Sequence, residues 1–319
     1  MIRVATIGLV AALVCSGGTA SGQSAACDRG CLRTVLMRYL NAVAANEPEE
    51  AGIIVGFRQT ENAEVRRVGA GAWQTVTGLG SVQRYFFDPV TGQAAYFGLV
   101  DESGEPAVVS VRIRVADRLV TEAEWFIGRE GQAGMAADGS GAAPFNPGNL
   151  LANPPPAERN VPPGERLSRE SLLGVTNSYF DAITSHDPAI MLIQPTCQRI
   201  ENGLQITGRE LPAGSDDGYE GRTNCSSGIR TTGRLNIRLV AARRYPLVDE
   251  VQQVVMGLAV FIREPESVNR RLGLSEFFYI DDQLISAVHA AMFYAAPDQP
   301  VPNWPPYDGN FPLPPRPVN

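Results

Sequence analysis

The chain has 319 residues, a formal net charge of −7, and a composition of 44% hydrophobic and 19% charged residues. All 27 basic residues are arginines, and no basic patch is interleaved with aromatic residues, so nucleic acid is not an expected partner. The length beyond the N-terminal segment suits two domains of ordinary size.

Residues 1–26 have the pattern of a signal peptide. Arg3 precedes an apolar run over residues 7–14, and small residues follow, with possible cleavage after Ala20 or Ala26. The run is too short to cross a bilayer, so we expect no stable membrane insertion. A lipid anchor on Cys15 or Cys27 is disfavoured by the residues that precede them. We therefore predict an exported protein, periplasmic or secreted.

One stretch occurs twice, at residues 39–64 and 179–204, and the copies align without a gap at an offset of 140. The identical pairs are Tyr39/Tyr179, Ala42/Ala182, Pro48/Pro188, Ile53/Ile193, Glu61/Glu201 and Asn62/Asn202. A repeat at a fixed offset indicates a duplicated structural unit.

Each copy predicts a helix followed by strands. In the first, apolar residues at helical spacing predict a helix over 28–47 that Pro48 ends. Strands are expected at 82–88, 93–101, 106–115 and 118–128. The second copy predicts a helix over 168–186, then strands at 235–245, 251–262, 272–280 and 284–294. A helix followed by an antiparallel meander is an α+β pattern.

These elements define the expected domain organisation. The first domain spans 27–130 and the second 167–296. Residues 131–166 are rich in Gly and Pro and predict a linker that is flexible at its start, and the tail 297–319 is rich in proline. The polar segment 209–234 has no counterpart of equal length in the first copy.

Four cysteines remain after cleavage: Cys27, Cys31, Cys197 and Cys225. Three pairings are possible, and we favour Cys27–Cys31 with Cys197–Cys225 because each pair then stays within one copy. The chain has two histidines and no Cys-x-x-Cys spacing, so we predict neither a metal nor a cofactor.

Several short motifs accompany this pattern. The first copy carries Thr60-Glu61-Asn62, Gly69-x-Gly71-x-Trp73-x-Thr75 and Asp88-Pro89-x-x-Gly92-Gln93, and the second carries Cys197-x-Arg199-x-Glu201-Asn202-Gly203. Residues 28–130 and 168–294 resemble the nuclear transport factor 2-like superfamily, which includes ketosteroid isomerase and SnoaL-like cyclases. The motifs are closest to an exported branch of unknown function. The resemblance implies two tandem cones, each a helix on a curved antiparallel sheet around an apolar pocket. It also implies that the two domains can pair as an internal pseudo-dimer.

The last hairpins of the two copies align at an offset of 165, so that Glu124 corresponds to His289 and Val111 to Glu276. Alternation places His289 on one strand face with Ala287, Ala291 and Phe293. If the turn before this strand has a two-residue loop, Glu276 lies on the same face and orients the imidazole as a general base. A three-residue loop would place Glu276 and His289 on opposite faces of the sheet.

Other residues are alternatives or supporting contacts. Glu122 and Glu124 share a strand face and are alternative acid–base groups, and His186 at a helix end is a third alternative. We expect Tyr179, Glu201, Asn202 and Phe293 to contact the substrate.

The resulting prediction is a cofactor-independent enzyme, an isomerase, dehydratase or lyase, that moves a proton on a small apolar or aromatic molecule. The alternative is a non-catalytic small-molecule-binding or interaction protein with the same fold, because the fold alone does not decide function.

Overall fold

The computed structural model describes residues 27–208, 223–229 and 236–304. The predicted signal peptide, most of the segment 209–234 and the tail beyond residue 304 lie outside the described residues. Within the described ranges, no helix combines the length and the apolar character that crossing a membrane requires.

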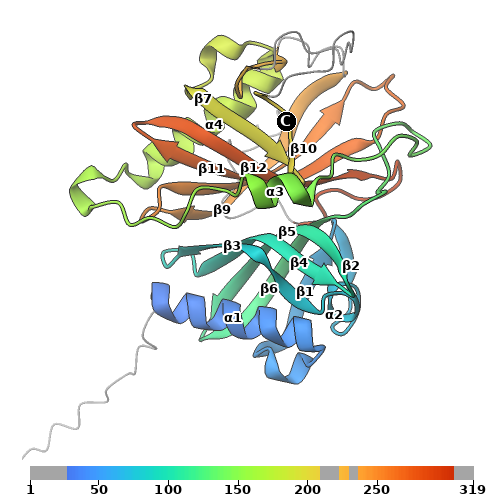
Figure 1. The fold of residues 1–319 in the computed structure, drawn as a ribbon, viewed down its shortest axis with the longest axis vertical. Coiled ribbons are helices and arrows are strands. Elements are labelled where there is room, and N and C mark those ends of the chain that lie inside the picture. Colours follow the sequence, from blue (N-terminus) through green and yellow to red (C-terminus); the bar gives the residue numbers. More distant parts are fainter. Residues whose placement is uncertain (1–26, 209–222, 230–235, 305–319) are drawn as a thin grey trace, which may run out of the picture.

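The first domain consists of one long helix and a six-stranded sheet (Figure 1). Its elements are α1 (Arg29–Ala45), η1 (Pro48–Glu50), β1 (Ile53–Glu61), β2 (Glu64–Arg66), α2 (Ala72–Thr75), β3 (Gly78–Asp88), β4 (Gln93–Glu102), β5 (Glu105–Ala116) and β6 (Leu119–Gly128). The strand order is β2-β1-β6-β5-β4-β3.

The second domain repeats this architecture. Its elements are α4 (Arg169–Ser185), η3 (Pro188–Ile190), β7 (Ile193–Glu201), β8 (Leu204–Gln205), β9 (Ile237–Asp249), β10 (Val254–Arg263), β11 (Arg271–Asp281) and β12 (Leu284–Ala295), in the order β8-β7-β12-β11-β10-β9. The expected class, two tandem α+β cones, is confirmed. The sheets are mixed rather than purely antiparallel, because β1 pairs with β6, and β7 with β12, in parallel.

The two long helices begin and end in the same way. Asp28 and Ser168 are the N-caps, and each side chain accepts a hydrogen bond from a backbone N–H three residues on. Asn46 and His186 end the helices in the left-handed conformation, with φ of 54° and 56°. Each helix then turns back through a short 3-10 segment into the first strand of its sheet.

The two sheets pack on each other and the helices cover their outer faces (Figure 1). Between the sheets lies an apolar cluster that draws on both domains, including Phe86, Phe97, Phe126, Leu247, Met256, Phe277, Tyr279 and Phe293. Ser110 on β5 and Ser275 on β11, which correspond at the offset of 165, meet here with their hydroxyl oxygens 2.7 Å apart. Contact between equivalent residues is the mark of a twofold relation between the copies.

Reciprocal ion pairs join each helix to the opposite domain. Arg29 at the start of α1 donates two hydrogen bonds to Asp249, of 2.7 and 2.8 Å. Arg169, its counterpart at the start of α4, pairs with Asp88 at 2.6 Å. Both aspartates are buried, so these pairs are charge-assisted and partly desolvated. The arrangement is isologous: each copy presents the same residues to the other.

The predicted linker is packed rather than free. It contains α3 (Pro147–Ala152) and η2 (Pro163–Glu165), and Leu150 of α3 is fully buried between the domains. The backbone N–H of Asn146 donates to the carbonyl of Asn202 (2.9 Å), and Arg84 binds the carbonyls of Pro155 and Pro156. Sequence periodicity did not reveal this packing because the contacts are with distant parts of the chain.

The segment after β12 makes the corresponding contact with the first domain. The side chain of Gln299 donates to the carbonyl of Asn62, the equivalent of Asn202. Trp304 donates its indole N–H to Thr60 and lies against the guanidinium groups of Arg58 and Arg112, at 4.8 and 4.9 Å. Each domain is therefore followed by a segment that crosses to the other domain.

Candidate functional site

The hairpin of β11 and β12 determines which face each predicted site residue occupies. Its turn has the two-residue loop Asp282-Gln283, with φ of 49° and 64°. A β-bulge follows, because Ile280 pairs with Ile285 but Tyr279 pairs with Ala287. A bulge adds one residue to one strand, so that beyond it the side chains of that strand point to the face opposite to the one expected from an unbroken pairing.

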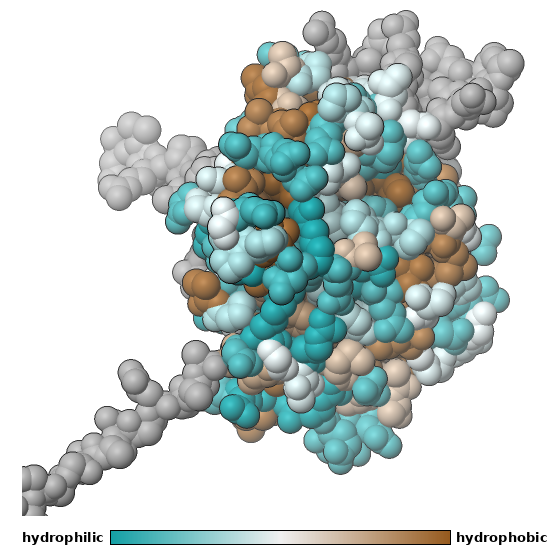
Figure 2. Space-filling model, turned by 60° about the vertical axis from the view of Figure 1, so that its left-hand side comes forward, coloured by the Kyte–Doolittle hydropathy of each residue, from teal (hydrophilic) through white to brown (hydrophobic). Residues whose placement is uncertain are grey.

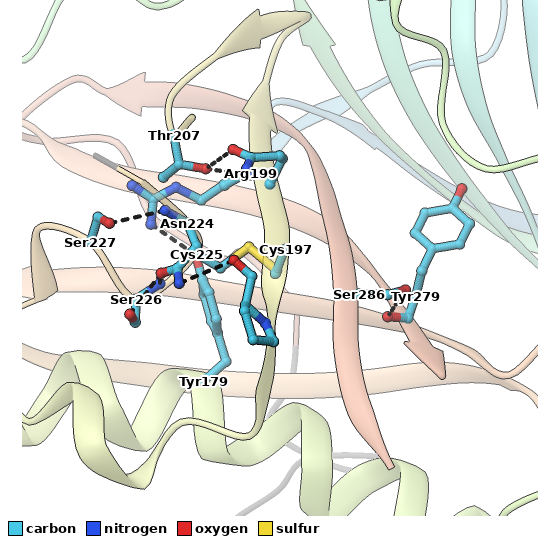
Figure 3. The surroundings of a disulfide bond; sticks show 12 residues. Tyr179, Cys197, Arg199, Thr207, Asn224, Cys225, Ser226, Ser227, Tyr279 and Ser286 are labelled. Carbon is cyan, nitrogen blue, oxygen red and sulfur yellow. Dashed lines mark hydrogen bonds between the residues drawn. A yellow bond between two sulfur atoms is a disulfide. The ribbon is translucent and has the colours of Figure 1, made fainter. Parts of the chain in front are cut away.

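The residue at the bulge, Ser286, donates its hydroxyl to the carbonyl of Tyr279 at 3.1 Å (Figure 3). The first domain has the same bulge and hydrogen bond at the equivalent position, where the hydroxyl of Thr121 donates to the carbonyl of Arg114 at 3.2 Å. The bulge is thus built into both copies.

As a result, Glu276 pairs with Ala290, whereas His289 pairs with Phe277. Residues paired across two strands share a face of the sheet, whereas successive residues along one strand point to opposite faces. Because His289 shares the face of Phe277, Glu276 and His289 lie on opposite faces of the sheet. The expected Glu276–His289 pair is therefore wrong. The loop has the two residues that would place Glu276 and His289 on one face, but the bulge puts them on opposite faces.

His289 lies between the two sheets and not in a cone. It is 3% exposed and packs against the rings of Phe97 and Tyr279, with centroid distances of 6.0 and 5.9 Å. Burial, assisted by the charge of Arg84, lowers the pKa of His289 to about 3, so the imidazole is neutral. Phe293 faces the same way and packs on Phe126, so its predicted substrate contact in the cone is also wrong.

The alternative carboxylates also lie on the sheet face between the domains. Glu124 accepts hydrogen bonds from Arg112 (3.1 Å) and from Arg244 of the second domain (3.0 Å). Glu122 accepts from the same Arg112 at 2.9 Å. Glu124 therefore links the two domains, whereas Glu122 bonds to arginines of its own domain, Arg112 and Arg114. Both carboxylates are paired with arginines, which does not suit the predicted acid–base role.

The repeated asparagine has a structural role in both copies. Asn202 has a φ of 44°, and its side-chain amide exchanges two hydrogen bonds with the backbone of Met292, both of 2.9 Å. Asn62 does the same with Ile127. In both copies the asparagine amide therefore joins the turn after one strand to the backbone of the neighbouring strand, which is a structural role. His186 caps α4 at a half-buried position, as Asn46 caps α1, and lies in the turn that follows the helix.

The residues that the second cone does bring together are Tyr179, Arg199, Glu201 and Glu276. Tyr179 rises from α4 and accepts a hydrogen bond from Arg199 on β7, at 3.0 Å (Figure 3). Arg199 also pairs with Glu201, its Nε lying 3.2 Å from the carboxylate. Tyr179, Arg199 and Glu201 are buried or half-buried residues that line the cone.

Glu276 is the most perturbed group in this cluster. It is 1% exposed, and its Oε2 has no hydrogen-bond partner among the described residues. Burial, reinforced by the charge of Glu201 and opposed by that of Arg199, raises the pKa of Glu276 to about 8. A buried carboxyl without a partner is costly to the fold, which makes it a candidate functional group.

The first cone has a different interior. Trp73 donates its indole N–H to Gln59 (2.8 Å), and Trp125 donates to the hydroxyl of Tyr39 (3.1 Å). All four side chains are at least 95% buried, and their polar atoms satisfy one another. The aromatic residues therefore fill the first cone with a hydrogen-bonded core.

The differences between the cones fall on the candidate site. At the offset of 165, Val111 becomes Glu276 and the facing Trp125 becomes Ala290, while Gln59 becomes Arg199 at the offset of 140. The second copy thus exchanges a large aromatic ring and an apolar partner for a small residue and a carboxyl. We expect this exchange to make the second cone the functional one.

The disulfides agree with the predicted pairing. Cys27 is bonded to Cys31 and Cys197 to Cys225. The second bond ties residues 223–229 to β7 beside Arg199 (Figure 3). Arg199 itself was missed as a site residue, although Cys197, Arg199 and Glu201 alternate along β7 and so share its inner face.

The described outer surface has two clefts, and both lie away from the predicted site residues. Apolar residues form separate patches divided by hydrophilic residues on the face shown in Figure 2. A surface cleft of about 660 Å³ is lined by Glu102, Arg129, Phe145 and neighbouring residues, and another of about 540 Å³ by Arg159, Gln253, Asp281 and neighbours. Neither is lined by any of the predicted site residues.

Comparison with family models matches one part of the chain. A family model described as a domain of unknown function (DUF8021) matches residues 165–292, which is the second domain. None of the curated proteins compared with the chain matches it.

Solved structures match single domains of the chain. They include an NTF2-like protein of unknown function from Cytophaga hutchinsonii (10% identity, 30% of this chain and 89% of that one, TM-score 0.26). A candidate ketosteroid isomerase from Kribbella flavida has 16% identity over 37% and 92% of the two chains, with a TM-score of 0.28. A protein of unknown function with a cystatin-like fold from Methylobium petroleophilum has 13% identity over 41% and 98%, with a TM-score of 0.27. The strand order and register of the chain itself define the fold.

Proposed function

We propose that the second domain binds a small, largely apolar molecule in its cone and moves a proton on it with Glu276, without a cofactor. The observation that carries this proposal is the buried carboxyl of Glu276, whose Oε2 is unpartnered among the described residues and whose pKa is raised to about 8. Glu276 takes the role of base that the sequence suggested for His289.

The raised pKa suits acid–base catalysis. A catalytic group works best when its pKa is close to the operating pH, because both protonation states are then accessible. Near neutral pH, Glu276 is mostly protonated and can donate its proton to a substrate oxygen. Once deprotonated in its apolar site, it is a stronger base than an exposed carboxylate.

Tyr179 and Arg199 supply the complementary contact. The hydroxyl of Tyr179 accepts from Arg199, so its own O–H remains available to donate to a ligand oxygen. The charge of Arg199 is balanced by Glu201, and with Glu276 protonated the cluster is neutral. Such a site favours a neutral substrate with a carbonyl or hydroxyl group, and the reaction classes it suits are isomerisation, dehydration and lyase chemistry.

We also propose export. The two disulfides are typical of an oxidising compartment, which agrees with the predicted signal peptide. Periplasmic or secreted localisation can be tested by fractionating cells that express the full chain.

The test of function is turnover and binding measured on the same variants. Small neutral carbonyl, hydroxy and aromatic compounds would be screened for binding, and then for turnover. We expect Glu276→Gln to keep binding and to lower turnover at least about 100-fold, the usual contribution of a general acid–base group. His289→Gln, on the opposite sheet face, should retain most of the turnover. Unchanged turnover in Glu276→Gln would remove Glu276 from the mechanism. Binding without turnover by the unmodified protein would favour the non-catalytic alternative.

A further inference from the structure

At one place in the contact between the sheets, an arginine pairs with a carboxylate of the other domain, and at the symmetric place a histidine occupies the position of that carboxylate. Arg244, which pairs with Leu258 across β9 and β10, reaches Glu124 in the other domain. Its counterpart by strand position is Arg84, because Arg84 pairs with Phe97, the residue equivalent to Leu258.

Arg84 has no carboxylate equivalent to Glu124 as its acceptor. The residue that corresponds to Glu124 is His289, and Arg84 donates instead to the carbonyls of Pro155 and Pro156. The position that holds a paired carboxylate in one half of the interface thus holds an imidazole in the other.

The surroundings of His289 admit only its neutral form. Its Nδ1 is buried, as is the hydroxyl of Tyr279, whose ring packs against the imidazole, and neither polar atom has a hydrogen-bond partner in the described part of the chain. An imidazolium is a donor at both nitrogens and would need two acceptors. The charged groups that act on this region are Arg84, which is a cation, and Glu158, which is already bound to Arg33 at 2.5 Å. Glu276 cannot serve, because it lies on the other face of the sheet.

We propose that His289 makes the contact between the two domains acid-sensitive, because it can take up a proton only in molecules whose sheets have parted. Protonation then draws the population toward the parted form, as any ligand that binds one of two states does. An imidazole in water has a pKa of about 6.5, so acidification from pH 7.5 to pH 5 should raise the opening equilibrium constant roughly 30-fold through this residue.

The chain suits a direct test because it contains only two histidines. Hydrogen–deuterium exchange would be followed in peptides from β5 and β11, which face each other between the domains, and in peptides from α1 and α4. The variants are His289→Phe and His289→Gln, which differ in shape and polarity, so that a packing defect in one does not decide the result. His186→Asn is the matched control, since Asn46 occupies the equivalent left-handed position in the first domain. Comparing variants at one pH cancels the intrinsic pH dependence of exchange.

In the unmodified protein and in His186→Asn, we expect exchange of the interface strands to rise on acidification by about 30-fold more than in either His289 variant. The helices should show a smaller rise. In NMR spectra, the signal of His289 should remain that of a neutral imidazole at pH 5. An equal rise in the His289 variants, an equal rise in helices and strands, or a His289 signal that titrates near pH 6.5 in the folded protein would each overturn the proposal.

Discussion

Replacing Glu276 by glutamine should stabilise the protein at neutral pH. Glutamine has the shape of a protonated glutamate and cannot ionise, so it removes the cost of a buried carboxyl without changing the packing. This cost can be worked from the structure, because Glu276 is fully enclosed and its pKa rises from 4.5 to about 8 in the fold.

The sign of the effect follows from proton binding. The folded pKa lies above the ordinary value, so the folded protein binds the proton more tightly than the unfolded chain does. The stability contribution of protonated Glu276 is fully present below about pH 4.5 and is lost as the pH rises to about 8. At pH 7 the loss is about 3 kcal/mol, and above pH 8 it approaches about 5 kcal/mol, at 1.36 kcal/mol per pKa unit.

The assay is urea denaturation of the unmodified protein and of Glu276→Gln at several pH values from 4.5 to 8.5. We expect nearly equal free energies of unfolding at pH 4.5 and a growing advantage for the variant at higher pH. Glu61→Gln is the control: Glu61 accepts hydrogen bonds from Ala72 N–H and from Arg129, so the same change should destabilise the protein. A Glu276→Gln variant that is less stable than the unmodified protein at pH 7, or a difference that does not vary with pH, would refute this account of the site.

Two further predictions concern the cross-links between elements. Glu124→Ala leaves Arg112 and Arg244 buried without their shared carboxylate, and should cost about 3–5 kcal/mol in urea denaturation; a cost below 1 kcal/mol would mean that water reaches the arginines. Replacing both Cys197 and Cys225 by serine removes a bond that spans 28 residues and should lower the free energy of unfolding by about 3–4 kcal/mol, measured without reductant; an unchanged value would show that residues 223–229 are held by other contacts.

Much of the fold could be predicted from local patterns. The apolar spacing in α1 and α4 and the N-cap Ser168 are determined by residues close in sequence, so they could be identified without the structure. The duplication was visible because the repeated residues, such as Asn62 and Asn202, hold the same backbone position in both copies. The disulfide pairing also followed from this repeat.

The candidate site depended on a feature with a weak local signal. Ser286 at the bulge is an ordinary strand residue by composition, and only its match with Thr121 in the first copy hinted at a shared role. Because side chains alternate with a period of two, one extra residue reverses every facing beyond it. That single shift separated Glu276 from His289 and turned the histidine toward the other domain.

The sequence by itself determined the two long helices, the strands of the hairpins and the fact that two copies of one domain follow each other, because these depend on interactions between near neighbours in the chain. Only the tertiary structure decided which polar residues meet. Glu124 pairs with Arg244, 120 residues away, and Glu276 lies in the second cone with Tyr179 and Arg199, which come from a helix and another strand. Such contacts depend on strand register, on bulges and on the packing of one sheet on another, and none of these can be read from the periodicity of residues along the chain.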